Sequence, residues 1–144
     1  MSDKKKVTGS CMCGSIKFET TADSTWTWYC HCTDCRRQSG APVAMYVGFP
    51  IDEVHWSGDE RAQYESSPGI FWGFCKKCGS SLTYEGGLTE VKIFEIHIGA
   101  IDQADNFPPK KHWFHNERIK WFDTTDHEVR LDGEGKPYRF DPAV

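Results

Sequence analysis

The sequence has no long apolar run, no excess of positive charge and no recognisable export signal. No stretch approaches the roughly 18 consecutive apolar residues of a membrane-spanning helix, so we expect no membrane partner. Lysine and arginine number 17 against 21 aspartates and glutamates, which leaves a net charge of -4 and argues against a nucleic-acid partner. The basic run Lys4 to Lys6 is followed by Val7-Thr8-Gly9-Ser10 and not by the apolar segment of a signal peptide. We therefore expect a cytoplasmic protein.

Helical periodicity is also weak, and short strand-like runs take its place. These runs alternate in polarity or are rich in aromatic residues, and Gly, Pro, Asp or Ser clusters bound each of them. This spacing predicts a mostly β fold, a sandwich or barrel of short antiparallel strands. The predicted strands are Ser15 to Thr20, Thr25 to Cys30, Ala44 to Phe49, Arg61 to Ser66, Ile70 to Phe74, Ser81 to Glu85 and Val91 to Gly99.

Length and composition are those of one globular domain. A chain of 144 residues with 38% hydrophobic and 26% charged residues can bury a core without disulfides. We predict a flexible N-terminal tail over residues 1–7 and a single domain over residues 8–144.

Cysteine, by contrast, is abundant. In a reducing compartment seven cysteines are better explained as metal ligands than as disulfides, and their odd number favours the same interpretation. They form three clusters: Cys11-Met12-Cys13-Gly14, Cys30-His31-Cys32-Thr33-Asp34-Cys35 and Cys75-Lys76-Lys77-Cys78-Gly79. A tight turn that offers two thiolates supplies half of a tetrahedral zinc site, and two such turns complete it. Gly14 and Gly79 can take the positive φ that such turns need.

The reach of each cluster predicts how the ligands divide. Cys30, Cys32 and Cys35 lie within six residues and can converge on one ion. The remaining residues, Cys11, Cys13, Cys75 and Cys78, would then form a closed four-thiolate site that ties the N-terminus to a distant hairpin. We predict two zinc ions per chain, of which the one held by four thiolates is structural.

The three-thiolate site has two interpretations. With three protein ligands and one open position it is catalytic; with a fourth side chain, such as His31, Asp34, His97, His112 or His115, it is structural. His31 itself is predicted to pack or to support the neighbouring ligands. Three thiolates make zinc a weak activator of water and favour an incoming thiol, so the chemistry predicted for an open site involves sulfur. Arg36 and Arg37 either hold a substrate carboxylate or support the turn from the surface.

The three clusters, in this order and with these glycines, resemble the glutathione-dependent formaldehyde-activating enzyme (GFA) family, which includes proteins of the centromere protein V type. The resemblance extends from about Thr8 to about Phe122 and includes the segments Gly58 to Ser66 and Pro109 to Phe114. It implies a β-rich fold built around zinc. It also implies that Cys11, Cys13, Cys75 and Cys78 bind the structural zinc, and that Cys30, Cys32 and Cys35 bind the catalytic zinc.

The founding activity of the family is that of a carbon–sulfur lyase that joins glutathione and formaldehyde into S-hydroxymethylglutathione. The resemblance therefore implies a zinc-dependent lyase with a small thiol, or a thiol adduct, as its partner. The alternative is a non-catalytic binding module that two structural zinc ions stabilise. Exchange of a thiol at the Cys30, Cys32 and Cys35 site distinguishes the two.

Overall fold

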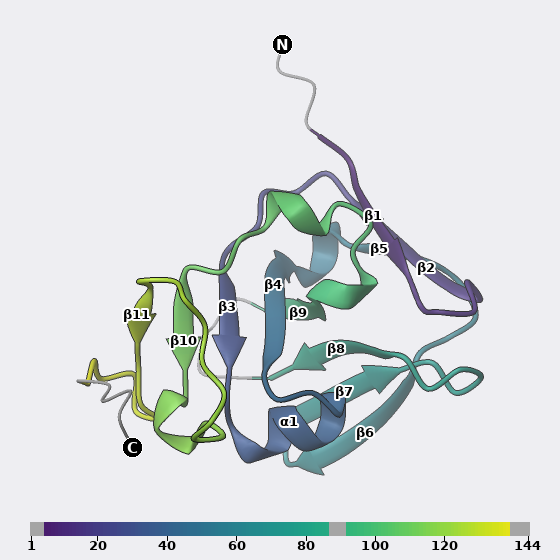
Figure 1. The fold of residues 1–144 in the computed structure, drawn as a ribbon. Helices are drawn as coiled ribbons and strands as arrows, with labels where there is room; N and C mark the ends of the chain where they lie inside the picture. The colour runs from purple at the N-terminus through teal and green to yellow at the C-terminus, as the bar shows by residue number, and fades with distance from the viewer. Residues whose placement is uncertain (1–4, 87–91, 139–144) are drawn as a thin grey trace. The chain divides into compact units, whose positions relative to one another are not determined.

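The computed structural model describes residues 5–86 and 92–138 (Figure 1). In these ranges the chain forms eleven β-strands, one α-helix and four 3-10 turns, which confirms the predicted mostly β class. None of the described helices is long and apolar enough to cross a bilayer. Contacts divide the chain into a first unit, Met1–Trp26 with Val47–Phe107, and a second unit, Thr27–Tyr46 with Pro108–Val144. The single-domain boundary at residue 8 stays a prediction.

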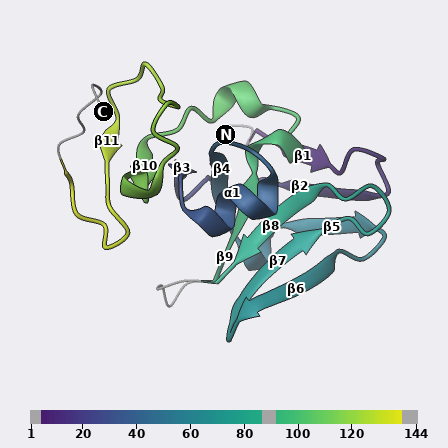
Figure 2. The same ribbon diagram turned by 60° about the horizontal axis from the view of Figure 1, so that its bottom comes forward.

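The first unit contains most of the strands. A three-stranded antiparallel sheet has the order β1-β2-β5, and a second antiparallel set has the order β9-β8-β7-β6 (Figures 1 and 2). The strands are β1 (Val7–Ser10), β2 (Ile16–Thr20), β5 (His55–Gly58), β6 (Ala62–Ser67), β7 (Ile70–Phe74), β8 (Ser81–Glu85) and β9 (Ile93–His97). The 3-10 turns of this unit are η1 (Ile51–Glu53), η2 (Ile98–Ala100) and η3 (Ala104–Asn106).

Strand β2 shows how the first unit forms its core. Ile16, Phe18 and Thr20 are buried while the two residues between them are exposed, the period of two expected for a strand with one covered face. Beside it, β1 passes very close to the chain at Ala100. A Cβ on Gly9 would lie 2.0 Å from the carbonyl oxygen of Ala100, so only glycine fits there. The buried cluster of this unit includes Cys11 and Cys75, which places two predicted ligands at its core.

The second unit is organised around three parallel strands in the order β11-β10-β3, visible in both views (Figures 1 and 2). Its elements are β3 (Thr27–Cys30), α1 (Thr33–Ser39), β10 (Lys111–Trp113), η4 (His115–Glu117) and β11 (Val129–Arg130). Strand β4 (Ala44–Pro50) begins in this unit and continues into the first. Helix α1 begins after Cys32, whose sulfur accepts a hydrogen bond from the Cys35 N–H, and ends at Gly40 with φ of 69°.

The predicted strands agree with the observed ones except at their ends. Each of the seven predicted runs contains one of the strands β2, β3, β4, β6, β7, β8 and β9, apart from one residue at the C-terminal ends of β4 and β6. Val91, at the start of the last run, lies outside the described residues, as do residues 1–4 of the predicted tail. Val7, the last residue of that tail, opens β1.

The parallel pairing of β3, β10 and β11 differs from the antiparallel arrangement that we predicted. Long connections, and not tight hairpins, join these strands.

Glu95 of β9 is a buried carboxyl group in the first unit. It is 9% exposed and accepts a hydrogen bond of 2.7 Å from Nε1 of Trp26. Burial raises the pKa of Glu95 to about 7, although the bond from Trp26 acts in the opposite direction. The folded chain therefore keeps a proton that the unfolded chain releases near pH ~4.3. This carboxyl lowers stability progressively as the pH rises from the unfolded to the folded pKa.

Replacement Glu95→Gln should remove that pH-dependent cost and keep an acceptor for Trp26. We expect the variant and the parent to differ little near pH ~4.5, and the variant to be more stable by up to about 3 kcal/mol above pH ~7. Urea unfolding at matched pH values measures the difference. A difference that stays constant across this pH range would contradict the raised pKa.

Candidate metal centres

Two turns of the first unit bring four cysteines together. Cys11 and Cys13 come from the turn between β1 and β2, and Cys75 and Cys78 from the turn between β7 and β8. Their four sulfurs lie within 4.8 Å of one another. Cys11 and Cys13 are 3.6 Å apart and Cys13 and Cys75 are 3.9 Å apart, measured between sulfurs. Zn–S bonds of about 2.3 Å at tetrahedral angles place sulfurs about 3.8 Å apart, whereas a disulfide needs about 2.05 Å, so this group fits a zinc ion.

The turns also supply hydrogen bonds to these sulfurs. The Ile16 N–H donates to the sulfur of Cys11 over 3.3 Å, and the Ser80 hydroxyl lies 3.1 Å from the sulfur of Cys78. The pKa of Cys78 is lowered to about 5, and this contact with the Ser80 hydroxyl is the largest cause. Gly14 and Gly79 both have φ of 77°, which confirms the positive φ expected of them. The group is thus prepared to carry negative charge.

The second cysteine group lies in the second unit. The sulfurs of Cys30, at the end of β3, of Cys32, and of Cys35 in α1 lie within 4.8 Å of one another. Cys30 and Cys35 are buried and Cys32 is half-buried. Among residues 5–86 and 92–138, no histidine or carboxylate joins this group. The group therefore offers a metal three thiol ligands.

Hydrogen bonds among the three thiols shift their pKa values in opposite directions. Hydrogen bonds from Cys30 and Cys35 lower the pKa of Cys32 to about 3, and its own hydrogen bond to the Cys35 N–H adds to this. The same contact with Cys32 raises the pKa of Cys30, and burial raises it further. Such a hydrogen-bonded set of thiols is the donor set that a soft or borderline cation binds, because a cation stabilises the remaining thiolates.

Arg36 supports this turn from within the second unit. Its Nε donates to the carbonyl oxygen of His31 over 3.1 Å, and its Nη2 donates to the carbonyl oxygen of Glu117 over 3.2 Å. Its guanidinium therefore links the cysteine turn to η4. Of the two roles that we considered for it, holding a substrate carboxylate and supporting the turn, these contacts agree with the second. Arg37, one position further along α1, is exposed.

Three histidines form a separate group in the second unit. His31, His112 and His115 are completely buried, and one ring nitrogen from each lies within 4.8 Å of the others. From the sequence we predicted all three as possible fourth ligands of the cysteine site, but we did not group them with one another. The spacing His112-Trp113-Phe114-His115 was the signal for such a group. His97, the other buried histidine among these candidates, belongs to the first unit.

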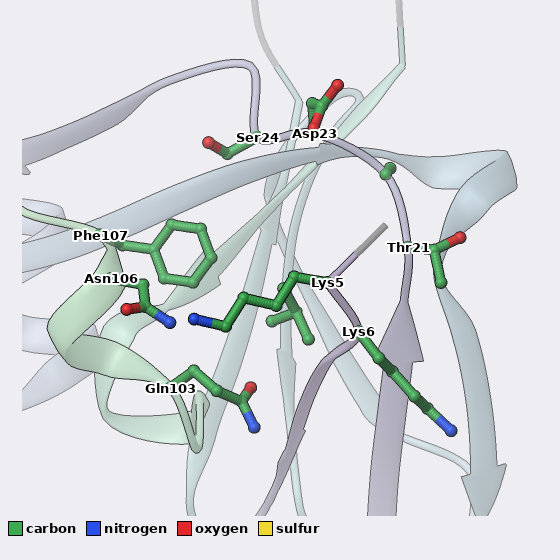
Figure 3. Close-up of a pocket in the computed structure, with 10 residues that line it drawn as sticks. Lys5, Lys6, Thr21, Asp23, Ser24, Gln103, Asn106 and Phe107 are labelled. Atoms are coloured by element: carbon green, nitrogen blue, oxygen red, sulfur yellow. The ribbon is translucent and has the colours of Figure 1, made fainter. Parts of the chain in front are cut away.

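A surface pocket of about 380 Å³ lies in the first unit and contains none of the cysteines. Lys5, Asp23, Gln103, Asn106 and Phe107 are among the residues that line it. Figure 3 shows the amino group of Lys5 extended toward Asn106 and the ring of Phe107. The pocket therefore shares no lining residue with either cysteine group.

The fold and the cysteine groups define a small, mostly β protein with two sites that could hold metal ions. The chain belongs to the glutathione-dependent formaldehyde-activating enzyme family, whose model matches residues 6–117, a range that contains all seven cysteines and the three grouped histidines. A crystal structure of a Rhodobacter sphaeroides protein resembles it in fold, with a TM-score of 0.54, 16% identity, and coverage of 67% of this chain and 88% of that one. No curated protein matches the chain.

Replacement Cys75→Ala should open the four-cysteine group. We expect a lower melting temperature, a lower yield of folded protein and one metal ion fewer per chain, because structural zinc contributes on the order of 10 kcal/mol to folding in small domains. Thermal unfolding and native mass spectrometry measure these changes. Met12→Ala is the matched control, since Met12 lies in the same group of turns and is 83% exposed. A Cys75→Ala protein that melts like its parent would overturn the structural assignment.

Proposed function

We propose that this chain is a zinc-dependent enzyme of the carbon–sulfur lyase type that acts on a small thiol adduct. Glutathione with formaldehyde, the pair in the description of its family, is the first candidate. In this proposal Cys11, Cys13, Cys75 and Cys78 hold a structural zinc ion, and Cys30, Cys32 and Cys35 hold the catalytic one. A reducing compartment such as the cytoplasm keeps these thiols available as ligands.

The observation that carries the proposal is the difference between the two cysteine groups. The group in the first unit has four sulfurs, two of them buried in the core, as a closed structural site requires. The group in the second unit has three sulfurs and no fourth histidine or carboxylate among the described residues. Three protein ligands with one open position are the arrangement of catalytic zinc.

The residues of the second group favour sulfur chemistry. A zinc ion held there would keep an incoming thiol in its thiolate form at the open position. Cys30, Cys32 and Cys35 donate enough charge to disfavour activation of water, and so select a soft ligand. In the forward direction the substrate sulfur forms a bond to the aldehyde carbon, the carbonyl π pair moves to the oxygen, and the thiol proton ends there. The lyase direction reverses these steps.

The first test is thiol binding and turnover by the reduced protein. Native mass spectrometry with added glutathione should show a thiol adduct on the zinc-loaded chain, and NMR should show that the chain accelerates formation of S-hydroxymethylglutathione from glutathione and formaldehyde. Cys32→Ala should contain one zinc ion fewer, lose the adduct and lose the acceleration, because it removes one of the three sulfurs that would hold the ion.

The control for that variant is Cys75→Ala, which alters the other cysteine group and should lose stability before it loses thiol binding. A zinc-loaded parent that remains inert to glutathione and other small thiols would refute the lyase and favour the binding module. Loss of all folded structure in Cys32→Ala would make the second site structural.

Arg37 is the exposed arginine next to the catalytic group, and glutathione is an anion. We expect Arg37→Ala to raise KM for glutathione by roughly tenfold or more with little change in kcat, because loss of a charge-assisted hydrogen bond costs about 1.5–3 kcal/mol of uniform binding. Steady-state kinetics with glutathione as the varied substrate measure this. Arg37→Lys should recover part of the loss, and unchanged KM in Arg37→Ala would exclude this contact.

A further inference from the structure

The buried histidine group occupies a well-defined position in the second unit. His31 follows β3, His112 lies in β10 and His115 opens η4. Backbone hydrogen bonds hold these segments together: the His31 N–H donates to the Trp113 carbonyl over 3.0 Å, and the His115 N–H donates to the Leu131 carbonyl over 2.9 Å. The three imidazoles are therefore brought together by the pairing of strands that are far apart in the sequence.

The histidines and the neighbouring cysteines face different ways. Cys30, His31 and Cys32 are consecutive, and side chains alternate in direction along extended backbone. His31 therefore points away from the sulfurs of its two neighbours, toward His112 and His115. Its Nε2 lies 2.9 Å from Nδ1 of His112, and its ring centre lies 4.8 Å from that of His115.

In two of the histidines, the ring nitrogen that faces away from the group has a hydrogen-bond partner of the kind found behind metal-bound histidines. Nε2 of His112 lies 3.0 Å from a carboxylate oxygen of Asp126, and Nδ1 of His115 is hydrogen-bonded to the hydroxyl of Tyr138. Carboxylates and other acceptors that bind the second nitrogen of a ligating imidazole fix its tautomer and its orientation. This pairing directs Nδ1 of His112 and Nε2 of His115 toward the interior of the group.

Asp126 is itself held in place. Its carboxylate accepts hydrogen bonds from the Glu128 N–H over 2.9 Å and from Nη1 of Arg130 over 3.0 Å, and a third from the Thr124 hydroxyl. These three bonds fix the position of the Asp126 carboxylate beside the ring of His112. Asp126 is therefore held where it can orient His112.

We propose that His31, His112 and His115 form a third metal site for a divalent transition-metal ion such as zinc. Three neutral imidazoles are ligands that suit such an ion. Metal–nitrogen bonds of about 2.1 Å at tetrahedral angles place ligand nitrogens about 3.4 Å apart. The nitrogens of this group lie within 4.8 Å of one another, and the His31–His112 pair is 2.9 Å apart, so shifts on the order of 1 Å would accommodate an ion. Asp123, whose Oδ1 lies 3.7 Å from Nε2 of His115, is placed to supply a fourth ligand.

Such an ion would tie β3 to the C-terminal part of the second unit. The histidines join β3, β10 and η4, and Asp123 and Asp126 lie on the segment that leads to β11. The site is independent of the lyase proposal, because it uses none of the seven cysteines.

Cobalt substitution distinguishes this site from the thiolate sites. The reduced protein is stripped of metal and titrated with Co²⁺ without oxygen; native mass spectrometry counts the ions, and thiolate-to-cobalt charge-transfer absorption reports only the cysteine sites. We expect three ions per chain in the parent. We expect His115→Gln to hold one fewer with unchanged charge-transfer absorption, and Asp126→Asn to bind the third ion 10–100-fold more weakly.

His127→Gln is the matched control, since His127 is exposed and lies in the same C-terminal segment; it should keep all three ions. A parent that saturates with its cysteine sites alone overturns the proposal, as does a His115→Gln variant that keeps the full count. If His115→Gln does not fold, Cys32→Ala supplies a second test, because it should still hold one ion that contributes no charge-transfer absorption. A result that refutes the histidine site would leave the test of thiol binding at the cysteine group unaffected. A result that refutes thiol binding would likewise leave the test of the histidine site unaffected.

Discussion

The convergence of four sulfurs from two distant turns is the constraint on which the first unit depends. The turn that carries Cys11 and Cys13 and the turn that carries Cys75 and Cys78 belong to different sheets, and Cys11 and Cys75 also pack in the core. Thiols at separations of 3.6 to 3.9 Å gain little from one another and repel when they ionise. A cation would remove that repulsion, so metal binding at this group would be coupled to the approach of the two sheets during folding.

The core of the second unit contains more polar side chains, relative to its aliphatic ones, than the core of the first unit. The buried side chains of the second unit include three histidines and two cysteines alongside few aliphatic residues, and the end of β3 contributes Cys30 to one group while His31, the next residue, belongs to the other. Burying imidazoles and thiols costs free energy unless each finds a partner. Pairing of β10 with β3 brings those partners together, with His112 opposite Tyr29 and Trp113 opposite Cys30. Strand register and polar pairing therefore stabilise the same arrangement.

Local patterns in the sequence were sufficient for part of this structure. Alternation bounded by turn residues located strands such as β2 and β7, and the spacing of the cysteines predicted which of them come together. Helix α1 has only seven residues, too few for an apolar period to appear, and β10 and β11 are three and two residues long. Their parallel pairing, and with it the meeting of His31 with His112, depends on contacts across about 80 residues of sequence that no local pattern reveals.

Charge supports the proposal that the two cysteine groups have different tasks. Four thiolates with a dication carry a charge of -2, and in the first unit the exposed Lys76 and Lys77 stand between Cys75 and Cys78; the thiolates help to raise the pKa of Lys77, after its salt bridge with Asp59. Three thiolates with a dication carry only -1, and a substrate thiolate raises this to -2 in a setting where Cys30 and Cys35 are buried. Poor solvation makes that extra charge costly, so an added thiolate is held loosely and leaves readily. In the proposed assignment, loose binding of a thiolate at the three-cysteine group would favour turnover, and the lysines between Cys75 and Cys78 would favour permanent retention of a metal ion by the four-cysteine group.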